Sequence, residues 1–428
     1  MHGKYPYHCN RFAGPPEPRH DTADPARRPG PVSHRPTVID LPPGSEFALI
    51  IVADRNMATL ENTFGRHGAL RLADGRALRR ETLEDADVLL VRSVTRVDAA
   101  LLEGTPVRFV GTATIGTDHL DLRWLEAHGI AWASAPGCNA DAAAQYTLGM
   151  ILLAWHRLGR ARADLGVGIV GHGNVGSRLA ALCEALGVPT VSNDPPLAEA
   201  GLGGLVILDE ALACPVVSLH VPLTRSGPWP TAHLVDGDVI ERMAPGALLV
   251  NAARGDVVDG DALTAALAAG RIHAALDVWP GEPRIDSALL HATTVATPHV
   301  AGYSTEGKRR GTTMVYDAFC RWLGVDMPAG APERTNSNES LDVRGHRDPI
   351  ARAVLETTGV ERDDAALRAA PCDVKAFDRL RRACGPRREF AQVRVRAPRT
   401  ALDMLCALGF DTPTAAMDRN TPNEASPA

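Results

Sequence analysis

Short apolar runs that each end in polar or glycine-rich residues recur along most of the chain. In the first part they are FALIIVADRN, ADVLLVRSVT, RFVGTA and GIAWASAPG. Such runs are typical of buried strands in a parallel sheet, and the intervening stretches are long enough for crossover helices. One of these stretches, MATLENTFGRHG, predicts a helix that closes at Gly68.

A segment of small and aliphatic residues at 141–160 predicts a long helix, after which a second series of runs begins. This series contains VGIVGHGNVG, VPTVSNDPP, PVVSLHVPL, GALLVNAARG, IHAALDVWPGEP and TVATPHVAGYS, followed by a predicted helix at 309–324. The carboxyl ends of parallel strands gather at one edge of a sheet, where ligands of open α/β folds bind. We therefore expect an α/β protein with doubly wound parallel sheets and a site at these loops.

The two ends of the chain depart from this pattern. Residues 1–44 hold ten prolines and few aliphatic residues, which is too little apolar surface to offset the entropy of ordering. We predict an unstructured extension at 1–46 and an unstructured tail at 412–428. Between a linker at 327–340 and this tail, helices are expected at 348–359, 377–385 and 401–410, with a strand at 388–397. Because this segment, 331–411, has too little core to stand alone, we expect it to form a homodimer contact.

Composition excludes several classes of function. The net charge of −6 argues against a general nucleic-acid binder. No apolar run approaches the roughly 20 residues of a membrane span, and the first residues contain no apolar signal core. The eight cysteines form no CxxC pair, which excludes a zinc ribbon and a thioredoxin-type motif. We expect a cytoplasmic protein with reduced thiols, no metal, no nucleic acid and no membrane partner.

The strongest motif is Gly171-His172-Gly173-Asn174-Val175-Gly176, because it follows an apolar strand and opens a helix. The first glycine makes the tight turn, the second admits a pyrophosphate, and the third lets the helix pack closely on the sheet. Asp194 ends the next strand and would bind ribose hydroxyls. Two prolines follow it, with no cation for a 2′-phosphate, which favours NAD over NADP. The alternative, a glycine turn without a nucleotide, is disfavoured by this context.

Three further strand ends offer an arginine, a glutamate and a histidine in order. Arg254 follows GALLVNAA, Glu282 follows IHAALDVWPG, and His299 follows TVATP. Arg254 could hold a carboxylate with two parallel hydrogen bonds. His299 could exchange the proton of a hydroxyl, and Glu282 could orient and stabilise the charged imidazole. In isolation each residue would be an ordinary loop residue, but the ordered set predicts a redox site.

Together, these motifs resemble those of the D-isomer-specific 2-hydroxyacid dehydrogenases. The segments VRSVTRVDAALLEGTPVRFVGTATIGTDHLD, SAPGCNA, SNDPP and GYSTEGKRRGT narrow the resemblance to the branch that oxidises 4-phospho-D-erythronate with NAD in pyridoxal 5′-phosphate biosynthesis. The resemblance covers about 48–325 well and the tail less specifically. It implies two Rossmann-like lobes: a substrate lobe split between 47–140 and 297–325, and an NAD lobe at 141–296. The segment 331–411 would be a small α+β dimerisation domain.

The resemblance also implies a role for individual residues. Arg254, Glu282 and His299 occupy the family's catalytic positions, and the product would be 2-oxo-3-hydroxy-4-phosphobutanoate. The implied NAD contacts are Gly171, Gly173, Asn174, Val175, Gly176, Asp194, Asp277 and Gly302, with Asp277 at the nicotinamide carboxamide. The implied substrate contacts are Ser93, Thr114 and Tyr303. Composition alone suggests Arg92, Lys308, Arg309 and Arg310 for the substrate phosphate, although at least two of them are better interpreted as solvated helix charges.

Two positions depart from the family pattern. Val221 stands where a threonine often contacts the cofactor, so one hydrogen bond of roughly 0.5–1.5 kcal/mol would be missing. Gln145 stands where an acidic residue is common. Two alternative functions stay open: a related dehydrogenase for 3-phosphoglycerate or glyoxylate/hydroxypyruvate, and a non-catalytic NAD-sensing interaction protein.

Overall fold

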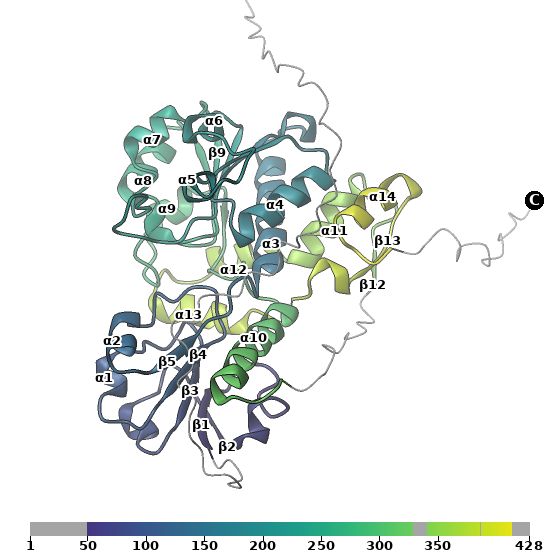
Figure 1. Ribbon diagram of the computed structural model, residues 1–428. Coiled ribbons are helices and arrows are strands. Elements are labelled where there is room, and N and C mark those ends of the chain that lie inside the picture. The colour runs from purple at the N-terminus through teal and green to yellow at the C-terminus, as the bar shows by residue number, and fades with distance from the viewer. Residues whose placement is uncertain (1–48, 328–339, 386, 413–428) are drawn as a thin grey trace, which may run out of the picture.

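The computed structural model describes residues 49–327, 340–385 and 387–412. The predicted extension at 1–46, most of the predicted linker and nearly all of the predicted tail lie outside the described residues. Figure 1 shows two lobes, each built around a sheet, with the C-terminal segment packed against them. Among the described helices, none is long and apolar enough to cross a membrane.

The first lobe contains a parallel sheet in the order β2-β1-β3-β4-β5. Its strands are β1 (Leu49–Asp54), β2 (Gly68–Ala73), β3 (Val88–Val91), β4 (Phe109–Thr112) and β5 (Ala131–Ala133). Short helices α1 (Ala99–Leu102) and α2 (Leu122–Ala127) follow β3 and β4. The helix α10 (Thr305–Leu323) returns to this lobe from far along the chain, and its Val315 and Phe319 share a core with Phe109.

The helix predicted to end at Gly68 is wrong. The segment contains turns and a single 3₁₀ turn, Phe64–Arg66, and Gly68 begins β2. A side chain at Gly68 would meet the backbone oxygen of Leu49 at 2.0 Å. The glycine therefore allows the close approach of two neighbouring strands and does not end a helix.

The second lobe contains a parallel sheet in the order β11-β10-β9-β8-β6-β7. Its strands are β6 (Val167–Val170), β7 (Thr190–Asn193), β8 (Val216–Leu219), β9 (Leu248–Asn251), β10 (His273–Leu276) and β11 (Val295–Ala296). The chain runs from β6 to β7 and then crosses to β8 on the other side of β6. Such a reversal leaves a crevice beyond the carboxyl ends of the strands, where ligands bind.

The helices of the second lobe cover this sheet, so its central strands β6, β8 and β9 are buried at every position. The helices are α3 (Ala140–Arg157), α4 (Asn174–Ala185), α5 (Pro195–Glu199), α6 (Leu208–Leu212), α7 (Gly237–Arg242), α8 (Gly260–Ala268) and α9 (Ser287–Ala292). The long helix α3 is buried along most of its length. α3 is buried because the sheet covers one side of the helix and the C-terminal segment covers another.

The C-terminal segment contains four helices and a two-stranded parallel sheet. These are β12 (Ser340–Asp342), α11 (Pro349–Thr358), α12 (Val360–Ala369), α13 (Val374–Ala383), β13 (Arg394–Arg396) and α14 (Arg399–Ala407). The predicted helices at 348–359, 377–385 and 401–410 are confirmed, whereas α12 and β12 were not predicted. The segment shares its core with α3: Val354 and Val360 belong to the same buried cluster as Ile151. Its core is thus supplied by its own chain, and the predicted dimer stays a prediction.

Candidate active site

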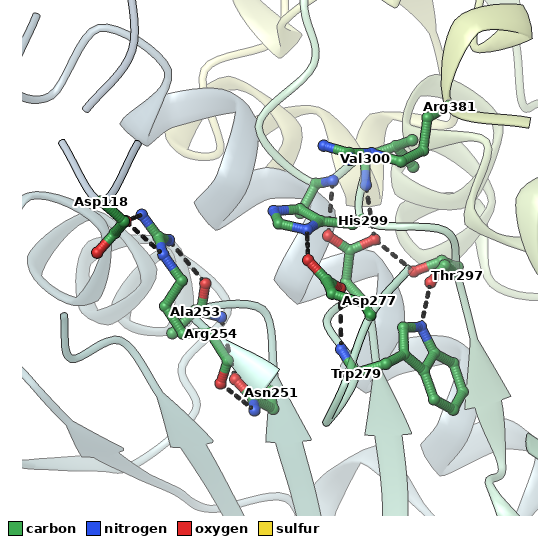
Figure 2. A network of polar contacts seen from close by, with 12 residues as sticks. Asp118, Asn251, Ala253, Arg254, Asp277, Trp279, Thr297, His299, Val300 and Arg381 are labelled. Atoms are coloured by element: carbon green, nitrogen blue, oxygen red, sulfur yellow. Dashed lines mark hydrogen bonds and ion pairs between the residues drawn. The ribbon is translucent and has the colours of Figure 1, made fainter. Parts of the chain in front are cut away.

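Arg254, Glu282 and His299 follow three neighbouring strands of the second sheet, β9, β10 and β11, and so lie at its carboxyl edge. Figure 2 shows Arg254 and His299 there. The loop that carries Arg254 is held by Asn251, whose side chain accepts from the Ala253 amide at 3.1 Å and donates to the Arg254 carbonyl at 2.9 Å. The sequence therefore places a cation at a strand tip and fixes the loop on which it stands.

The Arg254 guanidinium reaches across to the first lobe. Its Nε and Nη2 donate to one carboxylate oxygen of Asp118 at 3.1 and 3.0 Å (Figure 2). A side chain at Gly116 would lie 2.1 Å from Arg254 Nη2, so glycine is what lets the guanidinium lie against this loop. Asp118 thus engages the donors that a substrate carboxylate would use, a role that the sequence did not indicate.

His299 and Glu282 form a hydrogen-bonded pair through His299 Nδ1 and Glu282 Oε1. The other oxygen of Glu282 accepts from the Trp279 amide at 3.1 Å. Burial by itself raises the pKa of Glu282, but the attraction and hydrogen bond of His299, together with the Trp279 amide, outweigh it and hold this pKa below its usual value. Within the part of the chain that the structure describes, Nε2 is the ring nitrogen left for a substrate.

The backbone at His299 is left-handed, with φ of 57°, an uncommon conformation for a residue other than glycine. Asp277 holds this turn in place: its buried carboxylate accepts from Thr297 Oγ1 at 2.7 Å and from the amides of Val300 and Ala301 at 2.9 Å each. Asp277 is therefore a positioning residue for His299. The nicotinamide contact predicted for it stays a prediction.

The glycine motif forms a cradle between β6 and α4. Gly171 has φ of +96°, and a side chain at Gly176 would lie 1.9 Å from the Gly171 carbonyl oxygen. At Gly173, no atom of the described residues lies within 4 Å of an added Cβ. Gly171 and Gly176 are therefore required by the turn and by the close packing of α4. The open space at Gly173 is what a pyrophosphate at the start of a helix requires.

Asp194 stands at the tip of β7 as predicted. One of its oxygens accepts from the His172 amide at 2.8 Å and the other from the Leu197 amide at 3.1 Å, which caps α5. A carboxylate has about four lone-pair positions, so these two bonds leave capacity for ribose hydroxyls. The donor and acceptor set of the cradle therefore fits an NAD dinucleotide.

The other predicted contacts lie in loops that follow strands β3, β4 and β11, or at the start of α4. Thr114 Oγ1 donates to the Gly116 carbonyl at 2.9 Å and holds the loop that carries Asp118. Ser93 is exposed just beyond β3. The hydroxyl of Tyr303 accepts from Arg381 at 3.3 Å, and a side chain at Gly302 would lie 2.2 Å from Asn139 Nδ2. Asn174 and Val175 are the first residues of α4.

The four suggested phosphate ligands separate into two groups. Arg310 is committed to structure, since it donates to the Cys138 carbonyl at 2.8 Å and pairs with the buried Glu389 at 2.6 Å. Arg92 and Lys308 line a cavity between β1, β3 and α10. Arg309 is not among the described residues that line this cavity.

The two departures from the family pattern have structural counterparts. Gln145 Oε1 accepts from the Phe390 amide at 3.1 Å, which ties α3 to the C-terminal segment. Val221 packs against the core of the second lobe. The first departure is therefore explained by a contact made to another segment, and the second by apolar packing.

Residues 152–301 match the family of D-isomer specific 2-hydroxyacid dehydrogenases, NAD binding domain. The erythronate-4-phosphate dehydrogenase of Marinobacter nauticus is 45% identical over 380 residues, which are 85% of this chain and 99% of that protein. That of Edwardsiella ictaluri is 44% identical over 371 residues, 84% and 98% of the two chains. The chain belongs to the erythronate-4-phosphate dehydrogenase family.

Membership of the erythronate-4-phosphate dehydrogenases confirms the predicted oxidoreductase class and NAD as the cofactor, and the two parallel sheets confirm the predicted α/β lobes. The dimerisation role of the C-terminal segment stays a prediction. Among solved structures, the TT0316 protein of Thermus thermophilus is 27% identical with a TM-score of 0.55, and the match covers 65% of this chain and 99% of that one. The matches to the two erythronate-4-phosphate dehydrogenases cover 85% and 84% of this chain. The match to the Thermus thermophilus protein covers 65%, which is about the combined length of the two lobes.

Proposed function

We propose that the chain oxidises C2 of 4-phospho-D-erythronate with NAD and forms 2-oxo-3-hydroxy-4-phosphobutanoate, as a step in pyridoxal 5′-phosphate biosynthesis. The observation that carries the proposal is the hydrogen-bonded His299–Glu282 pair beside Arg254 in a chain 45% identical to an erythronate-4-phosphate dehydrogenase. A proton acceptor and a carboxylate-binding cation are the two groups that oxidation of a 2-hydroxy acid requires from the protein.

His299 takes the proton of the C2 hydroxyl through Nε2. Glu282 makes this possible because its bond to Nδ1 fixes the ring orientation and its negative charge stabilises the imidazolium that forms. The amide of Trp279 holds Glu282 in turn. The left-handed turn at His299, fixed by Asp277, sets the direction from which the ring meets the substrate.

Arg254 binds the C1 carboxylate. Its Nε and Nη2, which now donate to Asp118, are the pair of donors that a carboxylate accepts in a bidentate arrangement. Substrate binding therefore replaces the Asp118 carboxylate with the substrate's own. With the carboxylate bound there, the same guanidinium would polarise the carbonyl oxygen that forms at the neighbouring C2.

NAD, when bound, supplies the acceptor of the C2 hydride. The turn formed by Gly171, Gly173 and Gly176 would hold its pyrophosphate at the start of α4, where Gly173 leaves the space, and Asp194 would hold the ribose hydroxyls. Asn174, Val175, Asp277 and Gly302 are the further proposed contacts on the cofactor side. Ser93, Thr114 and Tyr303 are the proposed contacts on the substrate side.

The test is a substrate panel followed by NADH absorbance. The expected result is a clear preference for 4-phospho-D-erythronate over 3-phosphoglycerate and hydroxypyruvate, compared as kcat/KM. A preference for either of the others would replace the proposed substrate. NAD binding without turnover of any 2-hydroxy acid would instead support a sensing protein.

We also propose that the enzyme is a cytoplasmic homodimer whose contact lies in the C-terminal segment. The basis is the family resemblance, of the whole chain for the cytoplasm and of this segment for the dimer. Light scattering on the intact chain, about 45.5 kDa as a monomer, is expected to give twice that mass. A monomer at micromolar concentration would refute the dimer and leave the proposed reaction untouched.

A further inference from the structure

A cavity of about 250 Å³ in the first lobe is lined by an unusual concentration of cations. We call this cavity the basic pocket; its cations are Arg55, Arg76, Arg92, Lys308, Arg381 and Arg382. Three parts of the chain supply them: the ends of β1, β2 and β3, the helix α10, and the helix α13 of the C-terminal segment. The pocket therefore exists only when segments separated by more than 300 residues are assembled.

The basic pocket lies at the switch point of the first sheet. The order β2-β1-β3-β4-β5 reverses direction between β1 and β3, and the residues just beyond these strands, Arg55 and Arg92, both line the pocket. In open α/β sheets, ligands bind in the crevice that such a reversal leaves. The position of the pocket thus indicates a ligand site independently of its charge.

The positive charge of the pocket is only partly neutralised. Two carboxylates, Asp54 and Asp74, also line the pocket against its six cations. Arg92 pairs with the buried Asp54 at 3.3 Å, and Arg76 pairs with Asp378 at 2.8 Å. In the described part of the chain, Lys308, Arg381 and Arg382 have no carboxylate within ion-pair distance. Burial, and then the positive charge of Arg92, lower the pKa of Lys308. An anion entering the pocket would relieve this repulsion.

Arg381 connects the basic pocket with the reacting groups. Its Nη2 donates to the Tyr303 hydroxyl at 3.3 Å, and its Nε is buried without a hydrogen-bond partner in the described residues. The Tyr303 amide in turn donates to the Val300 carbonyl at 2.8 Å, next to His299. The charge of Arg381 also contributes to lowering the pKa of Glu282, the partner of His299, and Figure 2 draws Arg381 together with the residues around His299. An unpartnered guanidinium N–H at this position calls for an acceptor that the protein itself does not supply.

The helix α13 is anchored to both lobes, so Arg381 has a fixed place. Phe377 is buried in the core of the second lobe, and Asp378 pairs with Arg76 of the first. Figure 1 shows α13 lying between the two lobes. A side chain on this helix can therefore reach the cleft in the same chain that carries His299.

We propose that the basic pocket binds the phosphate group of the substrate and that Arg381 makes this binding depend on the C-terminal segment. The proposal rests on the proposed function, since it places the phosphate at one end of a four-carbon acid whose carboxylate Arg254 holds at the other. A phosphate dianion suits such a pocket because several guanidinium groups can donate to its oxygens at once. Specificity for a phosphorylated acid thus comes from a helix outside the two lobes.

The test compares Arg381→Gln, Arg381→Lys and a matched control, Arg379→Gln, which changes an exposed arginine on the same helix. The first measurement is calorimetric titration of the NAD-loaded chain with inorganic phosphate. The second is KM and kcat for 4-phospho-D-erythronate and for D-erythronate. Arg381→Gln is expected to weaken phosphate binding and raise KM for the phosphorylated acid by at least about tenfold, with Arg381→Lys intermediate and Arg379→Gln unchanged.

Two results would overturn the proposal. One is phosphate binding that is the same in Arg381→Gln as in the native chain. The other is an equal loss of kcat with both acids, which would make Arg381 a positioning residue for Glu282 and His299. Phosphate titration requires no turnover, so a chain that binds phosphate through Arg381 but leaves 4-phospho-D-erythronate unoxidised would refute the proposed function alone.

Discussion

At the scale of single residues, His299 combines a backbone strain with a chemical role. A non-glycine residue in the left-handed region costs about 1–3 kcal/mol, and Asp277 offsets this by accepting from the Val300 and Ala301 amides. Arg387 donates to the carbonyl groups of the same two residues, at 3.1 Å for Val300. The turn is thus held from both sides, and the ring direction is set by the backbone and by Glu282 together.

Replacing His299 by Asn is expected to remove proton transfer without disturbing this turn, because Asn tolerates positive φ better than most residues. We expect kcat for 4-phospho-D-erythronate to fall by at least about 10²-fold, with the dissociation constant of NAD unchanged. Steady-state kinetics and fluorescence titration of NAD measure the two quantities. A fall of less than about tenfold would assign the proton to another group.

Two histidines predict how stability depends on pH. Burial lowers the pKa of His119 to about 4; Asp118 opposes this shift and Arg254 adds to it, both to a smaller extent. Burial also lowers the pKa of His220 to about 4. Both folded-state values lie below the usual value of about 6.5, so the unfolded chain binds more protons between these limits. The free energy of unfolding is expected to decrease as pH falls from about 6.5 to about 4.

Urea unfolding at a series of pH values measures this dependence. His220→Gln is expected to flatten it, since one of the two groups no longer titrates, while the same change at the exposed His291 serves as the control. An unchanged slope in His220→Gln would show that the pKa of this histidine is the same in the folded and unfolded chains.

At this scale the sequence was informative where chemistry follows a strand end. Arg254, Glu282, His299 and Asp194 could be predicted because each comes shortly after an apolar run. Asp118 and Arg381 could not, because their roles depend on which loop or helix approaches the cleft in three dimensions. No local pattern distinguishes Arg381 from its exposed neighbour Arg379.

At the scale of elements, the turn between β6 and α4 separates two uses of glycine. A side chain at Gly176 would collide with the Gly171 carbonyl, whereas at Gly173 it would meet nothing in the described part of the protein. The glycine at 176 is required by the fold, and the one at 173 is open to a ligand. Both positions are glycine in the motif, so the sequence does not distinguish these two requirements, whereas the structure does.

Gly173→Ala is therefore expected to leave stability within about 1 kcal/mol and to weaken NAD binding by at least about tenfold. Gly65→Ala is the control, because its new Cβ would make only an ordinary contact of 3.9 Å with the Leu60 carbonyl. Thermal unfolding without NAD and calorimetry with NAD distinguish the two effects. Equal NAD affinity in both variants would contradict a pyrophosphate at this turn.

The elements also show where pattern reading fails. Most strands of both sheets could be predicted because buried parallel strands are short, continuous apolar runs. The composition of 57–68 favours a helix, but its last glycine serves strand pairing with Leu49. The helix α12 has a polar sequence and is fixed by tertiary contacts, among them the hydrogen bond from Tyr146 to Asp363 at 2.9 Å.

At the scale of the whole molecule, the C-terminal segment joins the two lobes. Asp364 accepts from the Ala296 amide at 2.7 Å in the second lobe, and Glu389 accepts from Ser304 Oγ at 2.7 Å and pairs with Arg310 on α10. These groups are buried or half-buried and far apart in sequence. Removing the whole segment is therefore expected to destabilise both lobes rather than to yield a folded monomer.

A milder test replaces one buried partner. Glu389→Gln leaves Arg310 with only its longer ion pair to Asp141 at 3.5 Å, and is expected to lower the free energy of unfolding by about 3 kcal/mol. Asp85→Asn, which breaks the exposed pair with Arg71, is the control and is expected to have a clearly smaller effect, because solvent screens an exposed ion pair. Urea unfolding measures both, and equal effects would mean that Glu389 contributes no more than a surface charge.

The wide spacing of the residues around the basic pocket has a consequence for chain synthesis. The first residue of the pocket lining, Asp54, leaves the ribosome long before the last, Cys384. The dinucleotide motif and the three reacting groups, in contrast, are complete by residue 299. A gene interrupted by a stop codon after α10 would still encode every motif by which such an enzyme is recognised. Its product would lack one wall of the pocket, so an open reading frame with intact motifs is not by itself a sign of a working enzyme in this family.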